Sequence, residues 1–162
     1  MAKEVEELQT KRLILRGIRE EDAPEIVKWR SDPEVYRYFK NPQKITIESH
    51  LNWYYHNYLL DESRFDWICV DKQTEKIIGV FGLNYNGNNA EVNYLLVPEA
   101  QHKGYAQEAI NCLISHARNY NVKTIIAEIH KDNSPSIALA ERMRFVYVKN
   151  NENFMIFSRE VS

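Results

Sequence analysis

Several common signatures are missing from this sequence of 162 residues. Its only two cysteines, Cys69 and Cys112, lie far apart in apolar segments, which indicates two thiols in a reducing compartment and excludes a disulfide framework. No apolar run approaches the roughly 20 residues that span a bilayer, and the acidic start has no signal-peptide core. We therefore expect a cytoplasmic protein without a membrane partner.

The sequence also lacks a large excess of either positive or negative charge. The chain has 21 basic and 23 acidic side chains, a formal net charge of −2, and no aromatic-interleaved basic patch. This balance gives no reason to expect a nucleic-acid partner. The five histidines share no metal-ligand spacing, so we expect no metal site. The five glycines form no dinucleotide or Walker pattern, and no nucleophile elbow or Cys/His dyad is visible.

The composition is that of a folded protein. Hydrophobic residues make up 44% of the chain and aromatic residues 12%, and no repeat or linker divides it. Area scaling allows a chain of this length to bury roughly 70% of its unfolded surface. We expect one domain over residues 1–162.

The first part of the chain predicts a strand followed by two helices. A strand is expected at 11–18, and a helix should follow the acidic residues 20–22 and end before Asp32-Pro33. Thr46 is a plausible N-cap for the second helix. Its expected apolar face consists of Leu51, Tyr54, Tyr55, Tyr58 and Leu59.

The rest of the chain predicts an α+β sheet with helices on both faces. Asn86-Gly87 predicts a tight hairpin, and a helix between two later strands predicts a right-handed crossover with parallel strands. Asn133 or Ser134 is the expected cap of a short helix. The expected strands lie at 66–70, 76–81, 91–97, 122–129, 145–149 and 154–159, and the expected helices at 105–119 and 134–143.

The most informative segment is residues 91–106, where a strand leads through a loop into a helix. A helix start offers unpaired N–H groups and positive potential, and Gly104 lets backbone approach a ligand, which suits a phosphate. The apolar run 95–97 breaks strand alternation, so a bulge with free amides is expected there. An ordinary strand-to-helix loop would give the same local pattern.

The register of the whole segment extends this interpretation. Residues 101–106, Gln-His-Lys-Gly-Tyr-Ala, match the acetyl-coenzyme A signature of Gln or Arg, two residues, Gly, one residue, and Gly or Ala, and Glu91 matches the preceding strand acid. A second cofactor segment is matched further along the chain by Asn133, Ser136, Leu139, Glu141 and Phe145. The chain resembles the GNAT N-acetyltransferase superfamily, and residues 10–16 and 20–23 resemble its ribosomal-protein N-terminal acetyltransferase branch.

The resemblance implies a mixed, mostly antiparallel sheet in which one parallel pair splays apart and admits acetyl-coenzyme A as cosubstrate. Amides of Leu96 and Val97 would meet pantetheine or the thioester. The remaining implied cofactor-binding residues are Gln101, His102, Lys103, Gly104, Tyr105, Ala106, Asn133 and Ser136.

The implied reaction is transfer of acetyl to a primary amine. Such an amine is protonated at neutral pH, so a base is expected, with Glu91 acting through water as first candidate and His130 and His102 as weaker ones. Tyr94 is expected to pack in the sheet. Many relatives place a tyrosine acid where this chain has Ala140. Water, Ser136 or no acid at all remain as alternatives.

The acceptor side is expected among the aromatic residues between positions 29 and 58. The candidates are Trp29, Arg30, Tyr36, Tyr38 and Trp53. The run 29–33 is similar to acetyltransferases of nucleotide-linked amino sugars, where Arg30 and Arg37 would meet phosphates. A polyamine or peptide amine would instead use acids such as Asp32, Glu34, Asp61 and Glu62. The acceptor class therefore stays open among small molecules, amino sugars and peptides.

A function of a different class is compatible with the same motifs. Ala140 favours a non-catalytic module that senses acyl-coenzyme A or acts as a scaffold, whereas the intact signature residues favour the enzyme. The sequence is also compatible with a homodimer.

Overall fold

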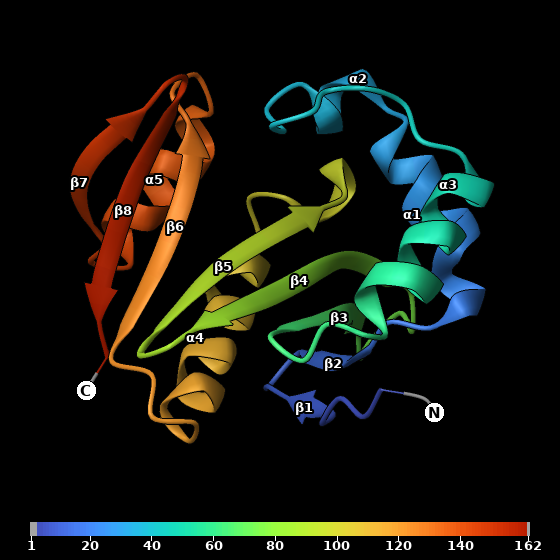
Figure 1. The fold of residues 1–162 in the computed structure, drawn as a ribbon, viewed down its shortest axis with the longest axis horizontal. Coiled ribbons are helices and arrows are strands. Elements are labelled where there is room, and N and C mark those ends of the chain that lie inside the picture. Colours follow the sequence, from blue (N-terminus) through green and yellow to red (C-terminus); the bar gives the residue numbers. More distant parts are fainter. Residues whose placement is uncertain (1–2, 162) are drawn as a thin grey trace.

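The strands of the chain pair into one sheet. In the computed structural model, which describes residues 3–161, eight strands lie in the order β1-β2-β3-β4-β5-β6-β8-β7 (Figure 1). All neighbouring strands are antiparallel except β5 and β6, which are parallel. The strands are β1 (Leu8–Gln9), β2 (Leu13–Gly17), β3 (Arg64–Asp71), β4 (Ile77–Asn86), β5 (Asn89–Leu96), β6 (Thr124–His130), β7 (Val146–Asn151) and β8 (Phe154–Glu160).

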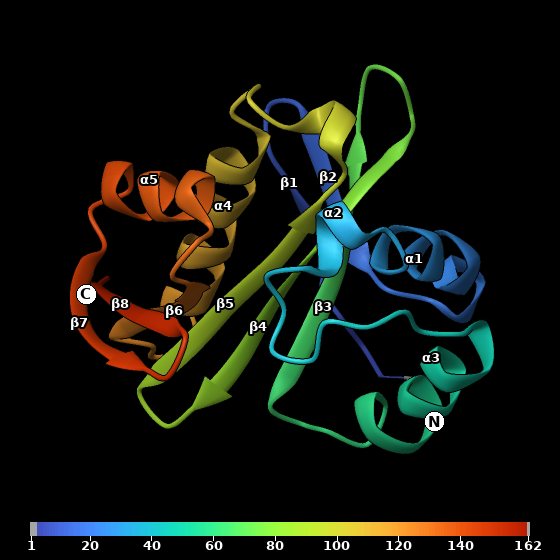
Figure 2. The same ribbon diagram turned by 90° about the horizontal axis from the view of Figure 1, so that it is seen from above.

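Helices cover both faces of this sheet. Figure 2 shows α4 and α5 on one face and α1 and α3 on the other. The helices are α1 (Ala23–Arg30), α2 (Pro33–Tyr36), α3 (Ile47–Trp53), α4 (Tyr105–Arg118) and α5 (Ser134–Arg142). The predicted fold class, a mixed and mostly antiparallel α+β sheet, is therefore confirmed. Across residues 3–161, no helix is long and apolar enough to cross a membrane.

Side-chain caps fix where the helices begin. The Thr46 hydroxyl accepts a 3.0 Å hydrogen bond from Ser49 N, so Thr46 caps α3 as predicted. Asn133 caps α5 by accepting from Ser136 N at 3.4 Å. Each bond satisfies an amide that the first helical turn leaves unpaired. The sequence did not predict the two-residue strand β1 or the single turn of α2.

The core lies between α4 and the centre of the sheet. The apolar stripe of α4 is buried, as its helical spacing predicts. It consists of Ala109, Ile110, Leu113, Ile114 and Ala117. The fully buried Trp67, Phe81 and Leu83 belong to β3 and β4 in the same cluster. Burying a large apolar side chain stabilises the fold by about 1.5–3 kcal/mol, so this contact holds α4 firmly against the strands.

The parallel pair β5–β6 separates along its length. Pairing runs from Asn89 opposite Thr124 to Val92 opposite Ala127 and then stops, although β6 continues to His130 along β8. The two strands diverge visibly in Figure 1. Residues 93–96 of β5 thus have a paired neighbour only on the β4 side.

Three local expectations need correction. No bulge interrupts residues 95–97, because the β4–β5 register is regular from Asn89 to Leu96. The hairpin turn consists of residues 87–88, one position later than predicted, with Gly87 at φ 61°. Tyr55 is 40% exposed because the chain after α3 continues as a π-helical turn, Tyr54–Tyr58, which turns this ring outward while Tyr58 stays buried. Cys69 and Cys112 are both free thiols, the first buried and the second half-buried.

Candidate active site

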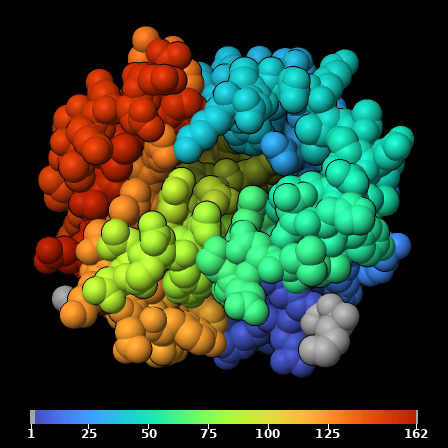
Figure 3. All heavy atoms as spheres, in the orientation of Figure 1, coloured from blue at the N-terminus to red at the C-terminus, as the bar shows by residue number. Residues whose placement is uncertain are grey.

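A cleft of about 740 Å³ occupies the gap between the diverging strands. Residues of β5, β6, α4 and α5 line it on one side, and residues of α1, α2 and α3 line it on the other. Figure 3 shows the hollow between the C-terminal strands and the segment around residues 35–45. The cleft therefore passes from one face of the sheet to the other.

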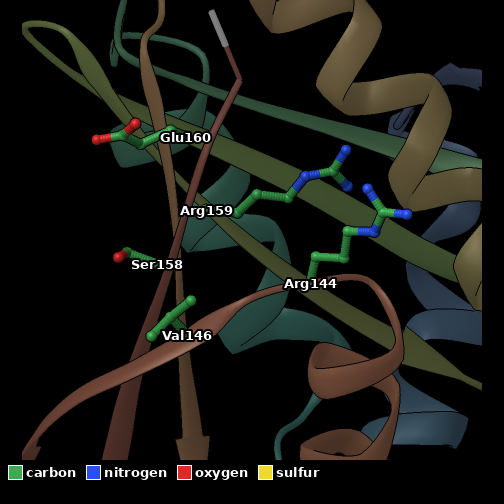
Figure 4. Close-up of a pocket in the computed structure, with 5 residues that line it drawn as sticks. All are labelled: Arg144, Val146, Ser158, Arg159 and Glu160. Carbon is green, nitrogen blue, oxygen red and sulfur yellow. The ribbon is translucent and has the colours of Figure 1, made fainter.

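A second, smaller pocket of about 470 Å³ lies at the C-terminal strands β7 and β8. Figure 4 shows the guanidinium groups of Arg144 and Arg159 extending to one side, whereas Ser158 and Glu160 point to the other. None of its lining residues lines the cleft.

One main-chain amide of β5 faces the gap and the next does not. Val97 N donates a 2.9 Å hydrogen bond to Ile78 O on β4, so Val97 and Ile78 form a hydrogen-bonded antiparallel pair. Because such pairs alternate with pairs whose polar groups point away, the N–H and C=O of Leu96 face the gap. The amide of Val97 is thus already bonded to β4 and is not free as predicted, whereas the main-chain groups of Leu96 face the gap.

The loop after β5 is held close to the strand. Gln101 Nε2 donates to Leu96 O at 3.2 Å, which ties the start of the loop to the edge of the gap. Gly104 then adopts φ 81°, a left-handed conformation that a residue without Cβ adopts readily. Gly104 is the N-cap of α4, and it lines the cleft together with His102, Tyr105 and Ala106. Lys103 is exposed and does not line it.

Arg12, which directly precedes β2, supports this loop through a contact that the sequence did not predict. Its guanidinium donates to Lys103 O at 3.0 Å, pairs with Glu108 at 2.7 Å and lies 4.3 Å from the centre of the Tyr105 ring. The hydroxyl of Thr10 also donates to Glu108. These contacts anchor the first turn of α4, whose amides point toward the loop. Arg12 and Glu108 are 96 positions apart, so no local pattern links them.

Across the gap, α5 contacts β5 through a pair of hydroxyls. The Tyr94 hydroxyl lies 2.9 Å from Ser136 Oγ, and both residues line the cleft. Burial raises the pKa of Tyr94, so the phenol is protonated at neutral pH. Its ring stacks on Phe81 with the centroids 5.4 Å apart, which agrees with the expectation that Tyr94 packs in the sheet. Ala140, one turn further along α5, is buried and offers no polar group.

Glu91 lies where β5 and β6 are about to separate. It stands on the face opposite α4, it is half-buried, and it lines the cleft. Burial raises its pKa, the cations Lys40 and Arg64 lower it, and Glu128 raises it further. Among residues 3–161, no side chain forms a hydrogen bond or ion pair with this carboxylate. A free carboxylate with a raised pKa is suited to accept a proton.

The two histidines named as alternative bases occupy less suitable positions. Nδ1 of His130 accepts a hydrogen bond from Asp132 N at 3.1 Å, and its ring packs between Tyr38 and Phe154. His102 is exposed on the loop at φ 63°, on the side of the gap where α4 begins. Glu91 is therefore the better placed of the three.

The structure brings together only part of the expected acceptor wall. Arg30, Tyr38 and Trp53 line the cleft. Trp29 is 8% exposed and packs in the core, because it points inward from α1 while Arg30 points to the cleft. Tyr36, on the short helix α2, does not line the cleft either. The structure therefore does not place Trp29 and Tyr36 in the cleft wall where they were expected.

Comparison with known sequences decides the family. The profile described as Acetyltransferase (GNAT) domain matches residues 12–146, which is most of the chain. The chain belongs to the GNAT acetyltransferase family. An uncharacterized N-acetyltransferase of Bacillus subtilis, YoaA, is 31% identical over 144 residues, which are 85% of this chain and 81% of that protein. This GNAT protein is therefore an N-acetyltransferase by descent.

Solved GNAT structures share the fold. The spermidine N-acetyltransferase of Vibrio cholerae in complex with CoA and spermine is 22% identical, with a TM-score of 0.80 over 94% of this chain and 97% of that one. RimL, a ribosomal L7/L12 α-N-protein acetyltransferase in complex with coenzyme A, is 19% identical, with a TM-score of 0.81 over 96% and 98%. At such identities the likeness shows the fold alone, so the acceptor must be argued from this chain's own residues.

Proposed function

We propose that this protein transfers an acetyl group from acetyl-coenzyme A directly to a primary amine. The observation that carries the proposal is the alignment of three features along one edge of the gap. These are the outward-facing amide of Leu96, the Gln101 bond to Leu96 O, and the left-handed Gly104 at the start of α4. Two findings support it: the chain belongs to the GNAT family, and two of its structural neighbours were solved in complex with coenzyme A.

The residues present fit a pantetheine arm and a diphosphate. A Cβ on Gly104 would lie 3.3 Å from Arg12 Nη2, so only glycine leaves both the backbone and the guanidinium in place. The amides of the first turn of α4 and the positive end of its dipole suit a diphosphate at this loop. The main-chain groups of Tyr94 and Leu96 that face the gap suit the amides of pantetheine. Asn133 and Ser136 face them from α5.

Glu91 supplies the base in this proposal. A lysine-like amine with a pKa near 10.4 must lose a proton before it attacks. Neutral pH lies about 3.4 units below that pKa, and deprotonating the amine costs about 1.36 kcal/mol for each unit. The Glu91 carboxylate, close to the point where β5 and β6 separate, receives that proton through water. Its raised pKa lies closer to neutral pH than that of an ordinary glutamate, which suits a general base. The amine nitrogen then bonds to the acyl carbon as the carbon–sulfur bond breaks.

Tyr94 and Ser136 supply the only hydroxyls that meet inside the gap among residues 3–161. The protonated phenol of Tyr94 is suited to donate to the departing thiolate, with Ser136 as its hydrogen-bond partner. A thiol with a pKa near 8.5 leaves readily, so this assistance is expected to be modest. The hydroxyl pair would thus replace the tyrosine that the family resemblance places at position 140.

A thiol-release assay with acetyl-coenzyme A tests the proposal against peptides, polyamines and amino sugars. We expect at least one class of amine to accelerate release, and Glu91→Gln to abolish that acceleration. Ala140 favours the alternative of a sensor that binds acyl-coenzyme A without turnover. Tight cofactor binding with no acceleration by any amine would support the sensor and contradict the enzyme.

A further inference from the structure

The charged side chains on the acceptor face of the cleft are mostly paired with one another. Three ion pairs line this face: Arg64 with Asp66 at 3.1 Å, Lys40 with Glu128 at 2.9 Å, and Arg37 with Glu34 at 3.5 Å. Two charges remain. Among residues 3–161, neither Arg30 nor Glu91 forms an ion pair or a side-chain hydrogen bond.

Arg30 is the last residue of α1 and is half-buried at the wall of the cleft. Its guanidinium lies 5.3 Å from the centre of the Phe39 ring, which covers one face of the group. Burial and the nearby charge of Arg64 both lower the pKa of Arg30, so its surroundings disfavour its positive charge. A guanidinium has five N–H donors, and leaving a half-buried cation without a partner costs free energy.

The carboxylate of Asp66, whose charge acts on Arg30, is paired with a different arginine. Asp66 is 3% exposed and accepts two hydrogen bonds from Arg64, from Nε at 3.3 Å and from Nη2 at 3.1 Å. Gly82 allows this arrangement, because a Cβ there would lie 2.5 Å from Asp66 Oδ1. The Asp66 carboxylate is thus bound by Arg64. Its charge raises the pKa of Arg30, but among residues 3–161 no hydrogen bond or ion pair joins Asp66 to Arg30, so the guanidinium at the cleft has no bonded partner.

The two unpaired charges stand apart on the same face. Arg64 on β3, Asn84 on β4 and Glu91 on β5 are direct cross-strand neighbours, so the backbones at Arg64 and Glu91 are about 10 Å apart. Arg30, at the end of α1, lines the same cleft and is close enough to Arg64 for the charge of Arg64 to lower its pKa. A molecule whose amine meets Glu91 at the gap would therefore place its far end beside Arg30.

We propose that the acceptor carries an anionic group, a carboxylate or a phosphate, which binds Arg30 several bonds away from the reacting amine. This inference rests on the proposed function, because it assigns the amine to the Glu91 end of the cleft. A polycation is disfavoured, since it would bring a positive group to Arg30 and would find Asp66 and Glu128 already paired. Trp53 and Tyr38 would flank the body of such an acceptor.

Matched acceptors test this assignment. Each pair consists of an amine without and an amine with an anionic group: ethanolamine with O-phosphoethanolamine, and propylamine with β-alanine. Spermidine serves as the polycationic acceptor, and steady-state thiol release is measured for all five compounds. A charge-assisted hydrogen-bonded pair changes affinity by about 10- to 100-fold. We expect each anionic amine to have at least a tenfold higher kcat/KM than its neutral partner. In Arg30→Met this advantage should disappear through KM, so that each anionic amine and its neutral partner have kcat/KM values within threefold of one another, and Arg30→Lys should restore part of the advantage.

Lys28→Met is the matched control, because Lys28 lies on the same helix, is exposed, and does not line the cleft. It removes the same charge and should leave every acceptor unaffected. Equal loss for anionic and neutral amines in Arg30→Met, or a preference of the wild type for spermidine, would overturn the proposal.

A binding measurement separates this proposal from the catalytic one. If no amine accelerates thiol release, the proposed function fails, and inorganic phosphate titrated into the isotope-labelled protein then tests the anion site alone. A saturable shift of the Arg30 Nε resonance that is absent in Arg30→Met would support the site. An unchanged resonance would overturn it.

Discussion

The Tyr94 hydroxyl lies 2.9 Å from Ser136 Oγ, which joins β5 to α5 across the gap where the parallel strands part. This contact places a protonated phenol at the gap, where the proposed function puts the thioester, whereas Ala140 of α5 offers no polar group. The proton donor proposed here thus belongs to the strand and not to the helix.

Tyr94→Phe tests this donor. The variant keeps the ring that stacks on Phe81, so we expect coenzyme A affinity to stay within threefold of wild type. Because a thiolate leaves readily, we expect kcat to fall by only about tenfold, less than the 100-fold or more that a positioned acid can contribute. Thiol release and calorimetry measure the two effects. Ser136→Ala, which retains the phenol, should lose less, and an unchanged kcat in Tyr94→Phe would exclude the phenol as donor.

Much of the fold and part of the site follow from local sequence. Thr46 and Asn133 cap helices where their side chains predict, and Gly104 begins α4 at the position that the signature indicates. These features depend on residues only a few positions apart, so the sequence determines them directly.

Other parts depend on tertiary placement. Whether the amide of Leu96 or of Val97 faces the gap depends on which antiparallel pairs are hydrogen-bonded, and the apolar run 95–97 does not reveal this. Trp29 and Arg30 are adjacent, and only the docking of α1 shows that the first is core and the second lines the cleft. Arg12, just before β2, reaches the loop from a segment 91 positions away.

Glu91→Gln separates catalysis from folding. Because burial raises the pKa of Glu91, the charged base is lost as pH falls through a value above that of an ordinary glutamate. We expect wild-type kcat to decline on the acidic side at that raised value, and the variant to lose about 100-fold in kcat together with this limb. Rate measurements across pH provide the check, and an unaltered profile would remove Glu91 from the mechanism.

The same substitution has a predicted effect on stability. A carboxyl whose pKa is raised on folding contributes stability that is present at low pH and is lost as pH rises through the folded-state value. At neutral pH the ionised Glu91 therefore disfavours the folded state, and glutamine should not. We expect the Tm of Glu91→Gln at pH 7 to equal or exceed that of wild type. A markedly lower Tm would show that the carboxylate has a structural partner.

Gly79→Ala tests the close approach of β4 to β5. A Cβ at this position would lie 2.3 Å from Leu95 O, a main-chain atom that can move only with its strand. We expect a loss of about 2–3 kcal/mol in the free energy of unfolding, as for overpacking in a core. Gly87→Ala is the control, since nothing lies within 4 Å of its added Cβ and only the left-handed backbone opposes it, at about 1 kcal/mol. Denaturant unfolding that ranked the control as the more harmful change would contradict this packing.

Calorimetric titration with coenzyme A tests the cofactor site most directly. The wild type should bind, and Gly104→Glu should lose measurable binding while keeping its fold by circular dichroism, because a bulky anion would occupy the diphosphate loop beside Arg12. Retention of wild-type affinity in Gly104→Glu would show that the diphosphate does not bind at the start of α4 and would contradict the proposed site.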